Sequence, residues 1–182
     1  MKELSLNILD ITQNSISAGA SLITIEVNKN VKENKLTISI ADNGKGMSED
    51  FAAHVCDPFV TTRTTRKVGM GIPLLKLASE QAGGKFEILS KLGVGTTVAA
   101  TFVLNHIDRL PLGDIGQTVS MLVSCNESVD FVYRHISDGK EFCFDTREIR
   151  AVLNGVPFNE PEVVLWMQDY IKEGIASVNG EV

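Results

Sequence analysis

The stretch "ILDITQNSISAGAS", Ile8 to Ser21, sets an acid and an amide four positions apart, just before a turn of small residues. Apolar residues at helical spacing predict a helix over residues 3–18, which Gly19 ends. Because side chains at i and i+4 share one helix face, Asp10 and Asn14 are expected to lie side by side. The polar pair also fits a solvated helix face, so its meaning depends on the rest of the chain.

The composition is that of a globular protein. The chain has 182 residues, of which 43% are hydrophobic, and no apolar run approaches the roughly 20 residues that span a bilayer. No secretory signal is visible, so we expect a cytoplasmic protein that does not enter the membrane. The cysteines Cys56, Cys125 and Cys143 are odd in number, far apart and without CxxC spacing. This pattern predicts neither a disulfide framework nor a zinc site.

Charge is distributed unevenly along the chain. Residues 1–105 hold 11 Lys and Arg against 10 Asp and Glu, whereas residues 106–182 hold 6 against 13. A nucleic-acid surface needs clustered Lys and Arg, so we expect no nucleic-acid partner.

The first part of the chain alternates helical and strand patterns. Apolar periodicity and turn residues predict a hairpin over 22–27 and 35–42, helices over 48–55 and 70–82, and a strand pair over 85–91 and 96–104. Helices packed on one face of a largely antiparallel sheet satisfy this order. We therefore predict an α+β, two-layer α/β sandwich with a mixed, mainly antiparallel sheet.

A second part is expected to follow the turn-rich segment 105–114. The segment "TVSMLVSC" fits a strand or a helix, and the next residues predict a hairpin around "SDGK" followed by two helices, over 145–153 and 159–173. We thus predict a domain over 1–105 and a small α+β extension over 106–182. The extension would cover the sheet or form a dimer interface; the alternative is a regulatory or partner-docking module. Its aromatic residues would be hairpin core in the first case and partner-facing in the second: Phe131, Tyr133, Phe142 and Phe144.

Four separate pieces of the first part carry polar and glycine-rich patterns. Besides Asp10 and Asn14 they are "DNGKGM" (Asp42–Met47), "DPFVTTRTTRKVGMGIPLL" (Asp57–Leu75) and "GVGTT" (Gly93–Thr97). Each alone has an ordinary explanation, because Asn-Gly and GxG sequences are common in turns. Their combination in this order is less easily explained as chance.

In this order the four pieces resemble the N box, first glycine box, lid with second glycine box, and third glycine motif of the GHKL ATPases. That superfamily includes gyrase B, the heat-shock chaperone, histidine kinases and mismatch-repair ATPases. "NSISAGAS" is similar to the mismatch-repair form, whereas "DPFVTTR" with "GMGIPLLKLASEQAGG" is similar to a histidine-kinase catalytic domain. The resemblance covers residues 1 to about 105 and implies a Bergerat-type ATP-binding domain.

The resemblance implies a role for each matching residue on the adenine and metal side. Asn14 would coordinate Mg²⁺, a hard cation that prefers oxygen ligands. Asp42 would accept a hydrogen bond from the adenine amino group. Gly44 and Gly46 would let the backbone approach the base, and Met47 completes the same motif.

On the phosphate side, backbone N–H groups of Gly69, Met70 and Gly71 would meet phosphate at a helix N-terminus. Arg63 and Lys67 of the lid would reach the γ-phosphate, although a solvated basic loop explains them equally well. Thr97 would complete the adenine side, with Thr96 as the next candidate.

Asp10 has a particular meaning within this resemblance. The position four before the magnesium asparagine is acidic in hydrolysing members, where it acts as general base, and in serine-kinase anti-sigma factors. Many histidine kinases carry asparagine there. Asp10 therefore favours a chain that activates a nucleophile.

These residues predict a regulatory protein that binds ATP and Mg²⁺ and either phosphorylates a partner protein or hydrolyses ATP. A phosphoacceptor would be supplied in trans, and a homodimer is possible. The alternative is a non-catalytic ATP sensor and protein-interaction module. An ATP-operated clamp of the mismatch-repair or gyrase type fits less well, because the second part is short and acidic.

Overall fold

The computed structural model describes residues 2–56 and 71–180. The elements in chain order are α1 (Leu4–Ser17), β1 (Leu22–Asn30), β2 (Lys35–Asp42), α2 (Glu49–His54), α3 (Gly71–Gln81), β3 (Phe86–Lys91), β4 (Gly95–Val103), α4 (Ile115–Cys125), β5 (Asp130–Ser137), β6 (Lys140–Asp145), α5 (Thr146–Leu153) and α6 (Pro161–Asn179). The predicted elements are present with small shifts at their ends, and the last helix continues to Asn179. No described helix has the length and apolar character needed to cross a membrane.

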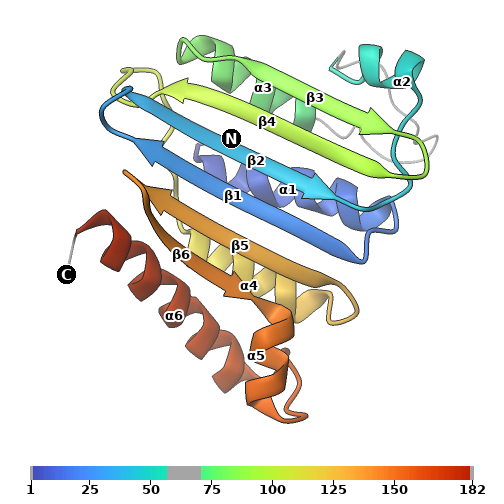
Figure 1. The fold of residues 1–182 in the computed structure, drawn as a ribbon, viewed down its shortest axis with the longest axis vertical. Coiled ribbons are helices and arrows are strands. Elements are labelled where there is room, and N and C mark those ends of the chain that lie inside the picture. The colour runs from blue at the N-terminus through green and yellow to red at the C-terminus, as the bar shows by residue number, and fades with distance from the viewer. Residues whose placement is uncertain (1, 57–70, 181–182) are drawn as a thin grey trace.

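One six-stranded sheet runs through the molecule, in the order β3-β4-β2-β1-β5-β6 (Figure 1). Strand β1 pairs in parallel with β5, and the other neighbours are antiparallel. The predicted α+β class with a mixed, mainly antiparallel sheet is therefore confirmed. Because β5 joins β1 directly, the same sheet continues from the first part of the chain into residues 106–182.

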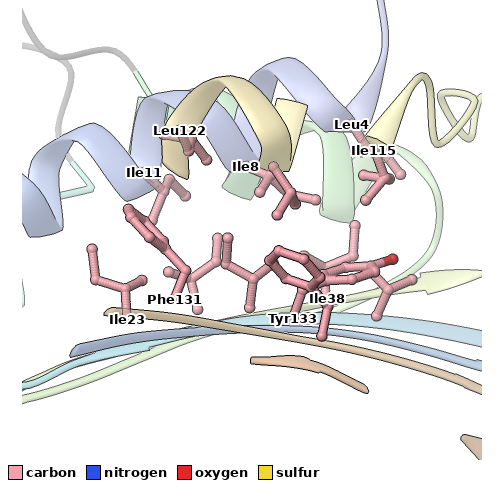
Figure 2. Close-up of a cluster of buried hydrophobic side chains, with 14 of the residues drawn as sticks. Leu4, Ile8, Ile11, Ile23, Ile38, Ile115, Leu122, Phe131 and Tyr133 are labelled. Atoms are coloured by element: carbon pink, nitrogen blue, oxygen red, sulfur yellow. The ribbon is translucent and has the colours of Figure 1, made fainter. Parts of the chain in front are cut away.

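Helices α1, α3 and α4 lie together on one side of this sheet (Figure 1). Side chains from α1 and α4 meet those of the central strands in a single core, as Figure 2 shows. Phe131, Tyr133 and Phe144 are fully buried in it, whereas Phe142 is half-buried. Phe131, Tyr133 and Phe144 are thus hairpin core, as one of the two interpretations of the sequence predicted.

The ambiguous segment before β5 forms the helix α4. Its N-terminus is capped by Asp114, whose carboxylate accepts the N–H of Gln117 at 2.8 Å. Val119 and Leu122 are buried against the core, which a helix achieves with one face. The cap and the helical periodicity together outweigh the alternation that favoured a strand.

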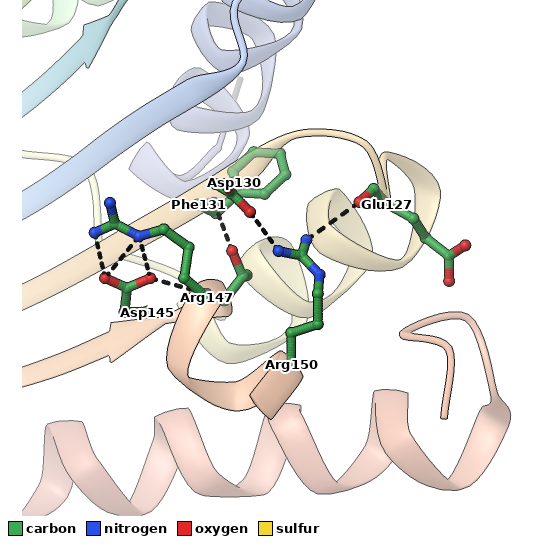
Figure 3. Close-up of polar contacts among 7 residues, drawn as sticks. Glu127, Asp130, Phe131, Asp145, Arg147 and Arg150 are labelled. Carbon is green, nitrogen blue, oxygen red and sulfur yellow. Dashed lines mark hydrogen bonds and ion pairs between the residues drawn. The ribbon is translucent and has the colours of Figure 1, made fainter. Parts of the chain in front are cut away.

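Helix α5 is attached to the hairpin through polar contacts (Figure 3). Asp145 accepts the backbone N–H and side chain of Arg147, and Arg150 donates to Asp130 at 2.7 Å. The buried hydroxyl of Thr146 accepts the N–H of Phe131 at 2.9 Å. These contacts hold the start of α5 at the end of β6.

Candidate functional site

Asp42, at the end of β2, is held in one orientation by two donors. The hydroxyl of Ser15 donates to its Oδ2 at 2.6 Å, and the N–H of Gly44 donates to its Oδ1 at 2.9 Å. Ser15 is buried on α1, directly after Asn14. The carboxylate therefore joins α1 to the sheet at the position where the polar pieces of the sequence come together.

Two further hydroxyl groups lie on the same face of the sheet. Thr96 is the register partner of both Asp42 and Ser90, and cross-strand partners project to the same face. The Ser90 and Thr96 hydroxyls are 2.8 Å apart, and the N–H of Met47 donates to Ser90 at 2.8 Å. Asp42, Ser90 and Thr96 thus form a polar cluster that faces the helices.

Thr97 does not share this face. Successive residues of a strand alternate between its two sides, so Thr97 projects away from the helix layer while Thr96 projects toward it. Thr96, the second candidate drawn from the sequence, is the threonine that lies beside Asp42.

The glycines of the loop after β2 are required by contacts within the protein. A Cβ on Gly44 would lie 3.0 Å from the carbonyl oxygen of Ala18, and one on Gly46, whose φ is 66°, would lie 2.0 Å from that of Lys91. Gly95 faces the backbone of Asp42 in the same way, at 2.0 Å. Gly44 and Gly46 were expected to let the backbone approach a base; the structure shows that they also lie close to other backbone segments.

Hydrogen bonds complete this packing. The N–H of Lys45 donates to the carbonyl of Ala18 at 3.0 Å, and the N–H of Gly93 donates to the carbonyl of Lys45 at 2.7 Å. The end of α1, the loop after β2 and the turn between β3 and β4 therefore form one connected unit around Asp42.

Asp10 and Asn14 lie one turn apart on α1, as predicted. Asp10 is exposed and Asn14 is half-buried. Helix α3 begins directly against this helix, since a Cβ on Gly71 would lie 2.9 Å from the Cβ of Asp10. Neighbouring groups displace enough water from the Asp10 carboxyl to raise its pKa above the ordinary value.

The remaining predicted residues lie outside the described residues. Arg63, Lys67, Gly69 and Met70 all fall within 57–70. Gly71 is the member of the second glycine motif that the structure places, at the first residue of α3.

A surface cavity of about 450 Å³ lies beside the polar cluster, between α2 and β3. Its described lining includes Glu49 and Cys56 from the α2 region, Lys76 from α3, and Ile88 and Ser90 from β3. Ser90 belongs to both the cavity and the cluster. Ser15 and Ser90 were not among the residues predicted from the sequence. Ser15 could have been noticed because it follows Asn14, and Ser90 because the predicted hairpin places it opposite Thr96.

The geometry agrees with comparisons to known proteins. The family model described as "Histidine kinase-, DNA gyrase B-, and HSP90-like ATPase" matches residues 1–106. The chain belongs to this family. The matched residues end just after β4 and therefore include α1, the loop after β2, and the β3–β4 turn.

Two sensor proteins of Pseudomonas aeruginosa are similar to this chain. The C4-dicarboxylate transport sensor protein DctB is 39% identical over 64 residues, which cover 35% of this chain and 10% of DctB. The sensor protein kinase FleS is 32% identical over 108 residues, which cover 59% of this chain and 26% of FleS. The chain thus matches only a tenth to about a quarter of the length of these relatives.

The fold of this histidine kinase-, gyrase B- and HSP90-like ATPase is similar to that of the Aquifex aeolicus MutL ATPase domain, solved in complex with ADP. The TM-score is 0.56 at 14% identity, with 85% of this chain and 70% of the MutL chain covered. Because 85% exceeds the part matched by the family model, the similarity of fold extends into residues 106–182.

The packing of Gly46 gives a prediction about the stability of the site. We expect Gly46→Ala to lower the free energy of unfolding by about 2 kcal/mol more than Gly93→Ala. Both glycines have positive φ, but a Cβ on Gly93 would meet open space while one on Gly46 would meet Lys91. Urea unfolding of the two variants measures the difference, and equal losses would mean that the close approach at Gly46 does not constrain the loop.

Proposed function

We propose that this chain binds ATP with Mg²⁺ at the Asp42 cluster and transfers the γ-phosphoryl group to a protein partner or to water. The observation that carries the proposal is the oriented carboxylate of Asp42, which stands at the end of β2 beside the helix that bears Asp10 and Asn14. Family membership supports a nucleotide as the ligand.

Asp42 is suited to select adenine. A carboxylate has about four acceptor positions, and Ser15 and Gly44 occupy two of them. The amino group of adenine would donate to a remaining position. Guanine has a carbonyl oxygen at the equivalent position of its ring, which would face the carboxylate without a proton between them. Thr96 and Ser90 are the neighbouring hydroxyls that would contact the base, directly or through water.

Asn14 fits a magnesium ion that arrives with its nucleotide. Its side-chain oxygen is a hard ligand, and within residues 2–56 and 71–180 no three His, Cys, Asp or Glu side chains gather to hold a metal by themselves. Mg²⁺ is commonly held by one or two protein oxygens with substrate phosphates and waters. The ion would neutralise negative charge on the phosphates, and Asn14 would fix its position relative to α1.

The phosphates would lie toward the start of α3. Gly71 begins this helix beside Asp10, and the positive end of a helix dipole attracts anions. By the resemblance of the sequence, Gly69 and Met70 would add backbone N–H groups, and Arg63 and Lys67 would contact the γ-phosphate.

Asp10 would act as the general base. It would take a proton from a water molecule or a partner's hydroxyl while that oxygen bonds to the γ-phosphorus and ADP leaves. A base works best with a pKa near the working pH. The partial loss of water around the exposed Asp10 carboxyl raises its pKa and so improves it for this role. Similarity to the sensor protein DctB and the sensor protein kinase FleS favours a protein partner supplied in trans and a regulatory role.

Adenine recognition is tested by removing the acceptor at position 42. We expect Asp42→Asn to weaken ATP binding by more than tenfold, because an amide would present a donor to the adenine amino group. Isothermal titration calorimetry measures the affinity, with Asp108→Asn as a matched control on the surface loop before α4. Unchanged affinity in Asp42→Asn would remove the assignment of Asp42 to adenine.

Catalysis is tested by turnover of ATP with Mg²⁺ in wild type and Asp10→Asn. We expect wild-type turnover to fall as pH drops through the raised pKa of Asp10, because the base is then protonated, and we expect Asp10→Asn to bind ATP without consuming it. If both proteins bind ATP equally and consume it equally, Asp10 is not the base. If neither consumes it, even with candidate acceptor proteins added, the chain is a nucleotide sensor.

A further inference from the structure

Helix α6 carries a stack of aromatic rings on the side that faces the edge of the sheet. The ring centroids of Trp166 and Tyr170 lie 5.3 Å apart with planes 15° from parallel. The centroids of Tyr170 and Phe142 of β6 lie 5.5 Å apart in an edge-to-face arrangement. Trp166 is 41% exposed and Tyr170 38% exposed, while Leu165 beside them is 62% exposed. The stack therefore begins in the hairpin and ends in solvent.

The orientation of α6 is fixed by the buried side next to the stack. Val163, Met167 and Ile171 are buried against α4 and the hairpin. Gly174 brings the helix against β6, because a Cβ there would lie 2.2 Å from the ring of Phe142. Rotation of the helix would bring a side chain into that contact, so the aromatic stack stays at the surface.

Acidic residues surround the stack. Glu162 lies one turn before Trp166 and Asp169 lies three residues after it, while Glu173 lies three residues after Tyr170. Together with Leu165, these residues form what we call the α6 outer face: Glu162, Leu165, Trp166, Asp169, Tyr170 and Glu173.

The cations of α5 and α6 pair with carboxylates outside this face. Lys172, the one cation of α6, contacts Asp114 at the start of α4 at 2.9 Å. Arg147 and Arg150 of α5 pair with Asp145 and Asp130, as Figure 3 shows. Among the described residues, no cation forms an ion pair with the three carboxylates of the α6 outer face. The face therefore combines exposed aromatic rings with uncompensated negative charge.

We propose that the α6 outer face binds a basic, amphipathic segment of another protein. An Arg or Lys side chain over the exposed ring of Trp166 would gain a cation–π interaction, with Glu162 and Asp169 within a helical turn to pair with its charge. Apolar side chains of the same segment would cover Leu165 and Tyr170. Tryptophan and tyrosine are enriched among residues that dominate binding at protein interfaces.

The charge of the face argues against a second copy of this chain as the occupant. A twofold contact would place each row of carboxylates against the same row of the other copy. Residues 106–182 have an excess of seven acidic residues, which adds to this repulsion. The proposal also does not rest on the nucleotide site, because α6 borders β6 at one end of the sheet and the polar cluster spans β2, β4 and β3 toward the other.

Trp166 makes the test direct, since it is the only tryptophan of the chain. The full chain is titrated with a synthetic helical peptide that carries Arg on one face and Leu on the other, and with a matched peptide in which Glu replaces Arg. We expect a saturable change in Trp166 fluorescence with the Arg peptide and at least tenfold weaker binding of the Glu peptide. Added salt should weaken the Arg complex.

Variants locate the binding surface. The double change Asp169→Asn and Glu173→Gln should weaken the Arg peptide at least fivefold, whereas Glu33→Gln with Glu87→Gln, which removes two exposed carboxylates elsewhere, should leave its affinity unchanged. Equal affinity for both peptides, no response to either, or equal loss in both double variants would overturn the proposal. So would sedimentation showing that wild type self-associates and that Trp166→Ala abolishes the association.

Discussion

The hydrogen bond from Ser15 to Asp42 is the contact on which the candidate site depends. It joins the first helix to the end of a central strand through a hydroxyl that is buried beside Asn14. Its length of 2.6 Å is typical of a charge-assisted O–H···O⁻ bond, a class roughly twice as strong as hydrogen bonds between neutral groups. Because Asn14 directly precedes Ser15 and Asp10 lies one turn earlier on α1, this one bond sets where the acid and the amide stand relative to the carboxylate of Asp42.

The second part of the chain holds helix α1 in place. The N–H groups of Leu4 and Ser5 lie in the first turn of α1, where the helix itself offers no acceptor. They donate to the carbonyls of Pro111 and Leu112 in the segment that leads to α4. Helix α4 then packs beside α1, and β5 extends the sheet through β1. The residues after 105 thus fix the N-terminal helix that bears the site, and they also carry the aromatic and acidic face of α6. A partner on that face would contact the same structural unit that holds α1.

Much of this was accessible from the sequence because it is encoded locally. Helical periodicity placed α1 and α3, alternation placed both N-terminal strands, and the Asp-Gly turn placed the C-terminal hairpin. The spacing of Asp10 and Asn14 needed only the geometry of a helix. The family resemblance then led us to expect that the polar pieces form one site. In the structure Asp42 is bonded to Ser15, next to Asn14, and Gly71 lies against Asp10.

The features that the sequence did not predict arise from contacts between distant segments. The parallel pairing of β1 with β5 joins residues about a hundred positions apart, which no local pattern specifies. Thr96 and Thr97 are neighbouring residues of the same type, so the sequence alone does not show which one lies beside Asp42. The strand register shows that it is Thr96. The glycines after β2 look alike in any turn, and only the backbone of Lys91 and Ala18 explains why a Cβ is excluded.

The most direct test of the account is a crystal structure of the chain with Mg²⁺ and a non-hydrolysable ATP analogue. We predict that the adenine amino group donates to the carboxylate of Asp42 with Ser15 still bound to it, and that the metal contacts the side-chain oxygen of Asn14. A nucleotide bound with its base away from Asp42, or with its metal away from α1, would contradict the assignment of this site.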